Sequence, residues 1–496
     1  MKKKLILFLS IFSCLIVSAS FEMNKNMQNA YLSIIDLKFE KGLDFIEKEK
    51  QQNPNNGLIH LHENYKDFLA LIIGEDQQLF DKISSNKSKR LSAIEKCNKN
   101  SPYYLYAKAE INLQWAFARL KFQEYFLAAY EIQKAYFLLE ENQEKYPDFH
   151  LNKKGMGLLH CLIGSIPENY QWIVNGIGVN GGIKQGLAEL DGLLLLTEQD
   201  ERYKFYNTEL LFLISFLEMN LTIDKSYFQE TLDKIGEKNK QHILLTFAAA
   251  RLSSALGNNE LTIQILENSP QLNKQFDFAY LEYLLGMSYL YKLDFEKSKQ
   301  MFHLFLTRFK GDNYIKSAYQ KLAWIAFLEG KIEKELISFE KVISEGKTLI
   351  DEDKVALKDA EEKKISDPVL LKARLLYDGG YYEKALNEIF TINNPDNLHY
   401  NSWIVEYYYR LARIQSKLGN DKQEVITYYQ KALKKGKGSK GYFEPMSALQ
   451  IGLIYEKQND FNQAEIYFKK CLSMKDFDYE RGIHQKARAG LERISN

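Results

Sequence analysis

The pattern of apolar and polar positions between Met446 and Leu472 predicts two helices that pack against each other. Apolar or small residues recur three or four positions apart, which is the spacing that places side chains on one face of a helix. Gly452 in the first helix and Ala464 in the second are small, so the two helices can approach closely. Tyr455 and Phe468 are then expected to fill the space around that contact.

The same pattern recurs upstream. Aligned on the small position of the second helix, the units fall at Ser298, Glu335, Ala385, Val425 and Ala464, and Glu335 fits that position poorly. Their spacings are 37, 50, 40 and 39 residues, and we assign the excess over the ~34 residues of a tetratricopeptide unit to longer loops. The chain thus resembles tetratricopeptide-repeat proteins. The predicted fold class is all-α, a tetratricopeptide-like helix-pair superhelix, or α-solenoid.

The N-terminal half is predicted to be helical but more divergent. The segment 109–139 carries Ala116, Ala128 and Ala135 at repeat spacing, and Pro147 after it predicts a helix end.

Three further segments complete the organisation. Segments 30–54 and 247–270 each predict a helix pair, and the charged stretch 346–367 predicts an exposed helix at a seam between units. The mature chain therefore divides into a divergent helical-repeat region at 20–200 and a tetratricopeptide-like array at 201–496.

The first 19 residues predict a signal peptide. Three lysines at positions 2–4 precede an apolar run of 13 residues, Leu5 to Val17, and Val17-Ser18-Ala19 matches a small-residue cleavage site. The apolar run is shorter than the about 20 residues of a membrane-spanning helix. No later segment is long and apolar enough to cross a membrane.

A lipoprotein signal that ends at Cys14 is the alternative for this leader. Phe12 is bulky for that motif, and the apolar run continues past Cys14, so simple export is favoured over a lipid anchor. We expect the mature protein in the periplasm or cell envelope of a bacterium.

The balance of charges bears on the choice of partner, and the cysteines bear on the core. Lys and Arg number 66 and Asp and Glu 65, which gives no basic field for nucleic acid, so no nucleic-acid partner is expected. The mature chain keeps Cys97, Cys161 and Cys471, an odd number in helical settings. Cys471 occupies a small core position of the repeat, where a buried apolar thiol is expected.

A glycine-rich segment between Gly155 and Gly182 lies outside the repeat pattern. It holds seven of the 27 glycines of the chain, which predicts close backbone approach and tight turns, above all at 176–182.

This segment resembles part of the eukaryotic tetratricopeptide-repeat-39 and inclusion-body-clearance family, in which a helix ends in a proline and a glycine-rich turn leads into a helix beginning Gly-Leu. The matching positions, in order, are Gly155-x-Gly157, Ile166-Pro167, Gly176-Ile177-Gly178 through Gly182, Gly186-Leu187, Gly311 to Lys316 before Ala323-Trp324, Tyr442 to Pro445, and Tyr479 to Leu491. The resemblance implies a helical architecture and a non-catalytic, partner-binding role. Members of that family are intracellular, so their cellular duties are not implied for a chain with an export signal.

No catalytic or cofactor motif is found. Gly176-x-Gly178-x-x-Gly181 formally matches a dinucleotide fingerprint, but no βαβ pattern surrounds it, so a structural turn is expected. His60 and His62 would point about 200° apart on a helix and cannot share a metal without a third element. His160 is expected at the core or its rim. We therefore expect no enzyme activity, cofactor or bound metal.

Aromatic residues mark the candidate binding surface, because aromatic side chains and Arg anchor interfaces. In a right-handed stack the first helix of each pair lines the concave face. The predicted partner-binding residues are Tyr280, Tyr283 and Met287 in one unit, Gln320 and Trp324 in the next, and Tyr409 and Arg413 in a third. The alternative is that these side chains pack against neighbouring repeats.

The function predicted from the sequence is that of an exported, non-catalytic scaffold whose concave face binds a protein or peptide partner. The alternative is an envelope glycan- or ligand-binding protein on a helical-repeat chassis. The low content of Trp (4) and Pro (8) speaks against that alternative.

Overall fold

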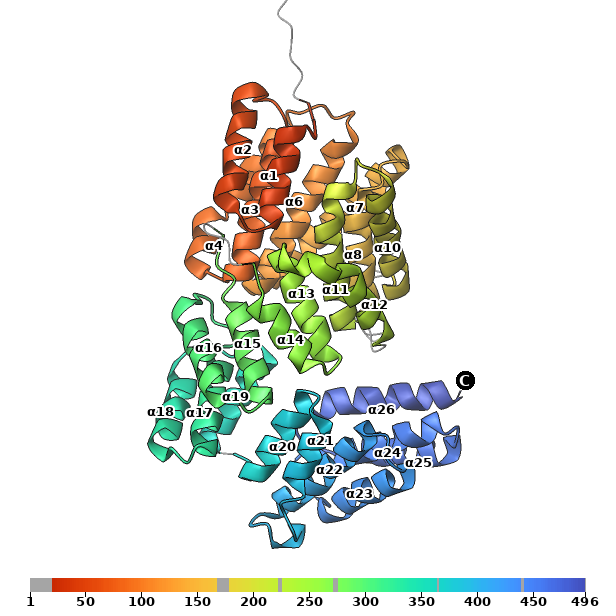
Figure 1. Ribbon diagram of the computed structural model, residues 1–496. Helices are drawn as coiled ribbons and strands as arrows, with labels where there is room; N and C mark the ends of the chain where they lie inside the picture. Colours follow the sequence, from red (N-terminus) through yellow and green to blue (C-terminus); the bar gives the residue numbers. More distant parts are fainter. Residues whose placement is uncertain are drawn as a thin grey trace, which may run out of the picture. The chain divides into compact units, whose positions relative to one another are not determined.

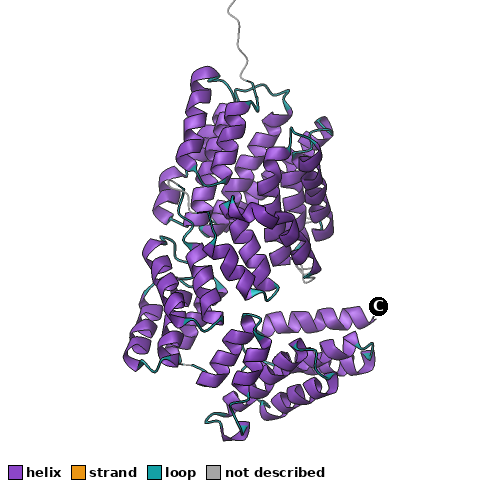
Figure 2. Cartoon of the chain, viewed as in Figure 1, coloured by secondary structure: helices purple, strands orange, loops and turns teal. Residues whose placement is uncertain are grey.

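The computed structural model describes residues 20–166, 178–221, 225–270, 275–363, 365–438 and 441–495. Within these ranges the secondary structure is helical and no strand forms, which confirms the all-α prediction (Figure 2). The chain forms two compact units: unit 1 comprises Met1–Leu252 and Asn268–Phe278, and unit 2 comprises Ser253–Glu267 and Ala279–Asn496. This division follows packing, whereas the predicted boundary at 200 follows the regularity of the repeat pattern.

The helices of these ranges include none with the length and apolar character of a membrane span. The predicted signal peptide and Cys14 lie outside the described residues, as do Pro167 and Gly176 of the glycine-rich segment.

Unit 1 is built of consecutive helices that pack as pairs, most closely α1 with α2, α6 with α7, and α8 with α10 (Figure 1). The first two of these are the pairs expected at 30–54 and 109–139. The helices of unit 1 are α1 (Lys25–Ile35), α2 (Phe39–Gln52), α3 (Leu58–Gly74), α4 (Gln77–Ile83), α5 (Asn86–Ile94), α6 (Pro102–Lys121), α7 (Tyr125–Lys145), α8 (Asn152–Gly164), α10 (Ile183–Gln199), α11 (Asn207–Leu221), α12 (Ser226–Ile235) and most of α13 (Ile243–Ala255), with short 3-10 turns at Lys204–Tyr206 and Gly236–Lys240.

Glycines bring α8 and α10 to backbone contact. A Cβ on Gly186 would lie 2.3 Å from the carbonyl oxygen of Gly157, and a Cβ on Gly164 would lie 2.5 Å from the amide nitrogen of Ile183. No side chain fits at such distances, so the expected close backbone approach is confirmed. The family resemblance implied that this helix begins at the Gly186-Leu187 pair. α10 instead begins at Ile183, so that pair lies inside the helix.

A buried ionic cluster joins five helices of unit 1. The Lys154 ammonium on α8 lies 2.9 Å from a carboxylate oxygen of Glu110 on α6 and 3.0 Å from one of Glu209 on α11. Lys154 also donates to the hydroxyl of Tyr65 on α3, which in turn donates to Glu110 over 2.8 Å. The hydroxyl of Tyr31 on α1 donates to Glu209.

Unit 2 contains the regular pairs. The expected partners are confirmed: α15 packs with α16, α17 with α18, α20 with α21, α22 with α23, and α24 with α25. Ser298, Ala385, Val425 and Ala464 are buried at the small position, whereas Glu335 is half-exposed. The helices of unit 2 are α14 (Asn259–Glu267), α15 (Tyr280–Tyr291), α16 (Phe295–Arg308), α17 (Ile315–Leu328), α18 (Ile332–Ser344), α19 (Asp351–Glu361), α20 (Pro368–Asp378), α21 (Tyr382–Ile389), α22 (Asn401–Lys417), α23 (Lys422–Lys435), α24 (Phe443–Lys457), α25 (Phe461–Ser473) and α26 (Glu480–Ser495), with a 3-10 turn at Pro395–Asn397.

The contact between α24 and α25 has the predicted geometry. A Cβ on Gly452 would lie 2.6 Å from the Phe468 ring, so the aromatic ring occupies the space that the glycine leaves. A Cβ on Gly490 of α26 would lie 2.5 Å from the same ring. Ala464 and Cys471 are fully buried beside it, and burial raises the pKa of the Cys471 thiol to about 12, as befits an inert core side chain.

The charged segment after α18 corrects one expectation. Its helix α19 does expose most of its charges, but it packs against α17 and α18 through Ala356 and Ala360, and Asp353 is fully buried. The Asp353 carboxylate accepts hydrogen bonds from the backbone N–H groups of Tyr314 and Ser317 at the start of α17. α19 is therefore a third helix that packs on the α17–α18 pair, and its Asp353 caps the start of α17. The mixed charges of its exposed face gave no indication of this role in the sequence.

Candidate functional site

Tyr280, Tyr283 and Met287 lie on α15, where Tyr283 belongs to the core of unit 2. Its ring is 5.4 Å from Phe305 and 4.9 Å from Tyr314 between ring centroids, and its side chain is 5% exposed. Tyr283 thus packs inside its unit and offers no surface to a partner. Tyr280 and Met287 are partly buried against the same cluster.

Gln320 and Trp324 lie on α17 and are also buried, at 1% and 5% exposure. The Gln320 amide donates to Asp359 of α19 over 2.7 Å. Two cations lie against the Trp324 ring: the Lys321 ammonium is 3.9 Å and the Arg374 guanidinium carbon is 5.1 Å from its centroid. Trp324 therefore supports two charged side chains instead of facing a partner itself.

Tyr409 and Arg413 lie on α22 and continue this arrangement. Tyr409 is 4% exposed and packs on Phe443, whereas Arg413 is partly exposed. The Arg413 guanidinium carbon lies 4.1 Å from the centroid of Tyr377 on α20 and 5.6 Å from that of Tyr409. Cation–π contacts thus connect α17 to α20 and α20 to α22.

These side chains form one continuous feature on the first helices of successive pairs, which we call the aromatic–cationic ladder. It consists of Lys321, Trp324, Arg374, Tyr377, Tyr409 and Arg413. Sequence analysis found Trp324, Tyr409 and Arg413, but it placed Tyr283, Gln320, Trp324 and Tyr409 on an open surface. They are buried because each first helix is covered by its own partner helix and by the neighbouring pairs.

The ladder holds three cations, Lys321, Arg374 and Arg413, with several carboxylates nearby. Asp378 lies 3.6 Å from Arg374, and the charges of Asp359, Glu352, Asp353 and Glu406 also act on Lys321 or Arg374. Burial, followed by the charge of Arg374, lowers the pKa of Lys321 to about 7. The Lys321 ammonium is thus costly to keep charged in this setting, and a bound anion would compensate it.

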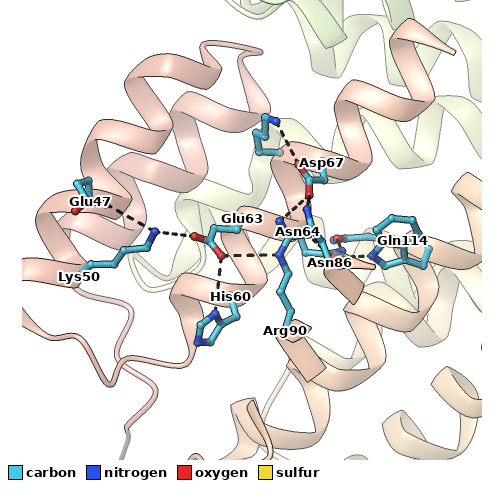
Figure 3. A network of polar contacts seen from close by, with 11 residues as sticks. Glu47, Lys50, His60, Glu63, Asn64, Asp67, Asn86, Arg90 and Gln114 are labelled. Atoms are coloured by element: carbon cyan, nitrogen blue, oxygen red, sulfur yellow. Dashed lines mark hydrogen bonds and ion pairs between the residues drawn. The ribbon is translucent and has the colours of Figure 1, made fainter. Parts of the chain in front are cut away.

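Unit 1 holds a second polar arrangement, which sequence analysis missed (Figure 3). A cavity of about 380 Å³ lies between α2, α3 and α5, lined among others by His60, Glu63, Asp67 and Arg90. The Arg90 guanidinium donates to Asp67 over 2.6 Å and to the side-chain oxygen of Asn64 over 3.1 Å. In sequence these polar residues look like helix surface, and only their spacing at 60, 63, 64 and 67 indicates a shared side of α3.

The three histidines considered as metal ligands lie in different surroundings. His60 lines the cavity, whereas His62 is 1% exposed and burial, with the charge of Lys154, lowers its pKa to about 3. His160 is buried and lies 2.7 Å from the Glu189 carboxylate. Among the described residues no three His, Cys, Asp or Glu side chains are grouped as metal ligands.

Comparison with known proteins identifies the repeat. The tetratricopeptide repeat family matches residues 447–478, which comprise most of α24, all of α25 and the residues that follow it. The chain therefore contains a tetratricopeptide repeat. The matched segment carries the Gly452–Phe468 contact described above, and the tetratricopeptide-repeat-39 resemblance stays a prediction within that assignment.

The solved structures that match the chain include three with 14% sequence identity or less. The human IFIT1 dimer with m7Gppp-AAAA is 14% identical, with 86% of this chain and 90% of that chain covered and a TM-score of 0.31. The APC/C hetero-tetramer Cut9–Hcn1 is 11% identical, with 95% and 97% covered and a TM-score of 0.23. Yeast Tom70 is 13% identical, with 95% and 88% covered and a TM-score of 0.23. No curated protein matches the chain.

The tetratricopeptide register also indicates how the missed ladder residues could have been found. Arg374 and Tyr377 occupy positions of α20 three residues apart, comparable to the four-residue spacing of Tyr409 and Arg413 in α22. Both precede the Asp378-Gly379-Gly380 turn, so extending the first-helix register along α20 as far as that turn would have included both.

Proposed function

We propose that this tetratricopeptide-repeat protein is a non-catalytic scaffold that binds a protein or peptide partner through the aromatic–cationic ladder. The observation that carries the proposal is the row of cation–π contacts across α17, α20 and α22. Partly exposed guanidinium groups held over aromatic rings are typical of interface anchors, because the contact with the ring limits the orientations of their planar donors.

The charge of the ladder selects the partner. Arg413 is partly exposed and forms no ion pair among the described residues, so a segment with acidic side chains would gain electrostatic attraction there. We therefore propose that the bound segment is extended and acidic, with aromatic or apolar residues between its carboxylates.

Peptide selection with matched variants tests this function. Display of random peptides on the purified full chain is expected to enrich acidic sequences. Arg413→Gln should then weaken binding of a selected peptide by about tenfold, the order expected for the loss of a charged hydrogen-bond partner. Lys417→Gln removes the same charge from an exposed position of α22 outside the ladder and should leave affinity unchanged. Fluorescence polarisation gives the affinities.

Two results would contradict the proposal. Equal affinities of the Arg413→Gln and Lys417→Gln variants would show that the ladder takes no part in binding. Displacement of the peptide by a single-stranded oligonucleotide at lower concentration than by free peptide would assign the ladder to nucleic acid, since stacked aromatic and cationic side chains can also hold bases.

We further propose that the mature chain is exported to the periplasm or cell envelope of a bacterium. The lysines and apolar run of residues 1–19 support this. Mass spectrometry of the mature N-terminus is expected to find Ser20 as the first residue. An intact Met1 would refute export, and an acylated Cys14 would replace simple export by lipid anchoring.

A further inference from the structure

The cavity in unit 1 is independent of the ladder and has the properties of a small-molecule site. Its volume of about 380 Å³ lies within the ~300–1,000 Å³ that ligand pockets usually have. Besides the polar side chains of α3 and α5, its lining includes Leu43 of α2, and the cations Lys66 and Lys89.

The floor of the cavity is pre-organised. Arg90 is 9% and Asp67 is 4% exposed, and Asn86 donates to the Asp67 oxygen that also accepts from Arg90. Behind them, the fully buried Asn64 donates to Gln114 over 2.7 Å and its oxygen accepts from the indole N–H of Trp115 over 2.8 Å. Stability alone does not favour such a network, since apolar side chains of similar volume usually pack as well. A network that fixes a guanidinium beside a cavity is what a binding site requires.

The cavity offers both hydrogen-bond donors and a hydrogen-bond acceptor to a ligand. Arg90 has more N–H groups than its two bonds to Asn64 and Asp67 use, and Lys89 makes no ion pair among the described residues. The Glu63 carboxylate is paired with Lys50 through one oxygen, at 2.9 Å. Its other oxygen has Arg90 and His60 only at 3.8 Å and 3.9 Å, beyond hydrogen-bond distance.

Glu63 is ionised at neutral pH. Burial would raise its pKa, but His60 and Lys50 beside it lower the pKa to about 2. The second carboxylate oxygen of Glu63 has no close hydrogen-bond donor, whereas Lys89 and Arg90 have N–H groups available. Such a cavity suits a ligand that carries both an anionic group and a hydrogen-bond donor. The lining carries Lys66, Lys89 and Arg90 against Glu63 and Asp67, a net charge of +1 when His60 is neutral.

We propose that this cavity binds a small amphoteric ligand of the acidic α-amino-acid class. The carboxylates of the ligand would bind to Arg90 and Lys89, and its ammonium group would donate to the second oxygen of Glu63. A ligand of net charge −1 would neutralise the lining. This proposal does not depend on peptide binding in unit 2.

Calorimetry on the full chain with L-glutamate, glutarate and L-lysine, each at millimolar concentration, tests the site. L-Glutamate is expected to bind, and glutarate, which lacks the ammonium group, should bind at least about tenfold more weakly because Glu63 then stays without a donor. Lys89→Gln should weaken L-glutamate binding by a similar factor, and this variant is expected to fold because the Lys89 side chain is exposed. Lys96→Gln, exposed and outside the cavity, is the matched control.

Glu63→Gln separates recognition from stability. In a variant that keeps its helical circular dichroism, the preference for L-glutamate over glutarate should disappear. The proposal is overturned if no probe binds, since the network then serves only to pack α2, α3 and α5. It is also overturned if glutarate binds as tightly as L-glutamate, or if Lys89→Gln and Lys96→Gln bind L-glutamate equally.

Discussion

Replacing Lys154 by methionine is expected to destabilise unit 1 by about 3–5 kcal/mol, the usual cost of removing one partner from a buried ion pair. Lys154 is 2% exposed and is the cation between the carboxylates of Glu110 and Glu209. Burial alone would lower the pKa of Lys154, but the two carboxylates raise it, so the ammonium stays charged. Methionine fills the same space but leaves the buried carboxylate of Glu110 and the partly buried carboxylate of Glu209 without their cation.

Urea unfolding of the full chain, combined with amide hydrogen exchange to locate the change, measures this effect. Protection should fall in α3, α6, α8 and α11, which contribute to the cluster. Lys153→Met is the control, because the neighbouring side chain is partly exposed and makes no ion pair among the described residues. Adding Glu110→Gln and Glu209→Gln to Lys154→Met should recover part of the loss. Equal unfolding midpoints for the two single variants would refute the role of the cluster.

Glu218→Gln should stabilise unit 1 above neutral pH and have little effect in acid. Glu218 on α11 is 5% exposed, and one of its oxygens accepts from Thr231 over 3.0 Å while the other has no partner among the described residues. Burial, opposed in part by that bond, raises the pKa of Glu218 from 4.5 to about 7, with Asp191 and Glu230 adding to the rise and Lys234 opposing it.

The sign of the pH dependence follows from the raised pKa. Between pH 4.5 and 7 the folded chain holds a proton on Glu218 that the unfolded chain has released, so stability decreases as the pH rises through this window. A shift of that size corresponds to at most about 3 kcal/mol. The Glu218→Gln variant does not lose this stability as the pH rises, so it should melt at a higher temperature than the wild type at pH 8. Glu230→Gln, exposed on α12, should show no such gain, and a wild-type stability that does not fall between pH 5 and 7 would contradict the assignment.

The fold of the regular pairs could be predicted because each contact needs a particular size of side chain. Gly452 and Phe468 are complementary, because the aromatic ring fills the space that the glycine leaves. Such constraints appear directly in the sequence. The role of α19 could not be predicted, since one buried carboxylate, Asp353, is indistinguishable in sequence from the exposed acids beside it.

For the candidate site, the sequence predicted which positions on the first helices belong together, but not which of these side chains are exposed to solvent. Trp324, Tyr409 and Arg413 do belong to one ladder, in which Arg374 and Tyr377 of α20 link Trp324 to Arg413. Which of them stay accessible depends on the loops and on neighbouring pairs, and these vary in length from unit to unit. Tyr283 is buried because it packs on Phe305 of the partner helix α16 and on Tyr314. The polar network around Asn64 required side chains from three helices, which no local pattern links.

Photo-crosslinking from the ladder tests the binding account most directly. A photoreactive benzoylphenylalanine at Tyr377, on the first helix of its pair, should attach to a selected acidic peptide. The same group at Tyr428, a partly exposed tyrosine on the second helix α23, should not. Attachment at Tyr428 and none at Tyr377 would place the partner on the opposite helices and contradict the proposed function.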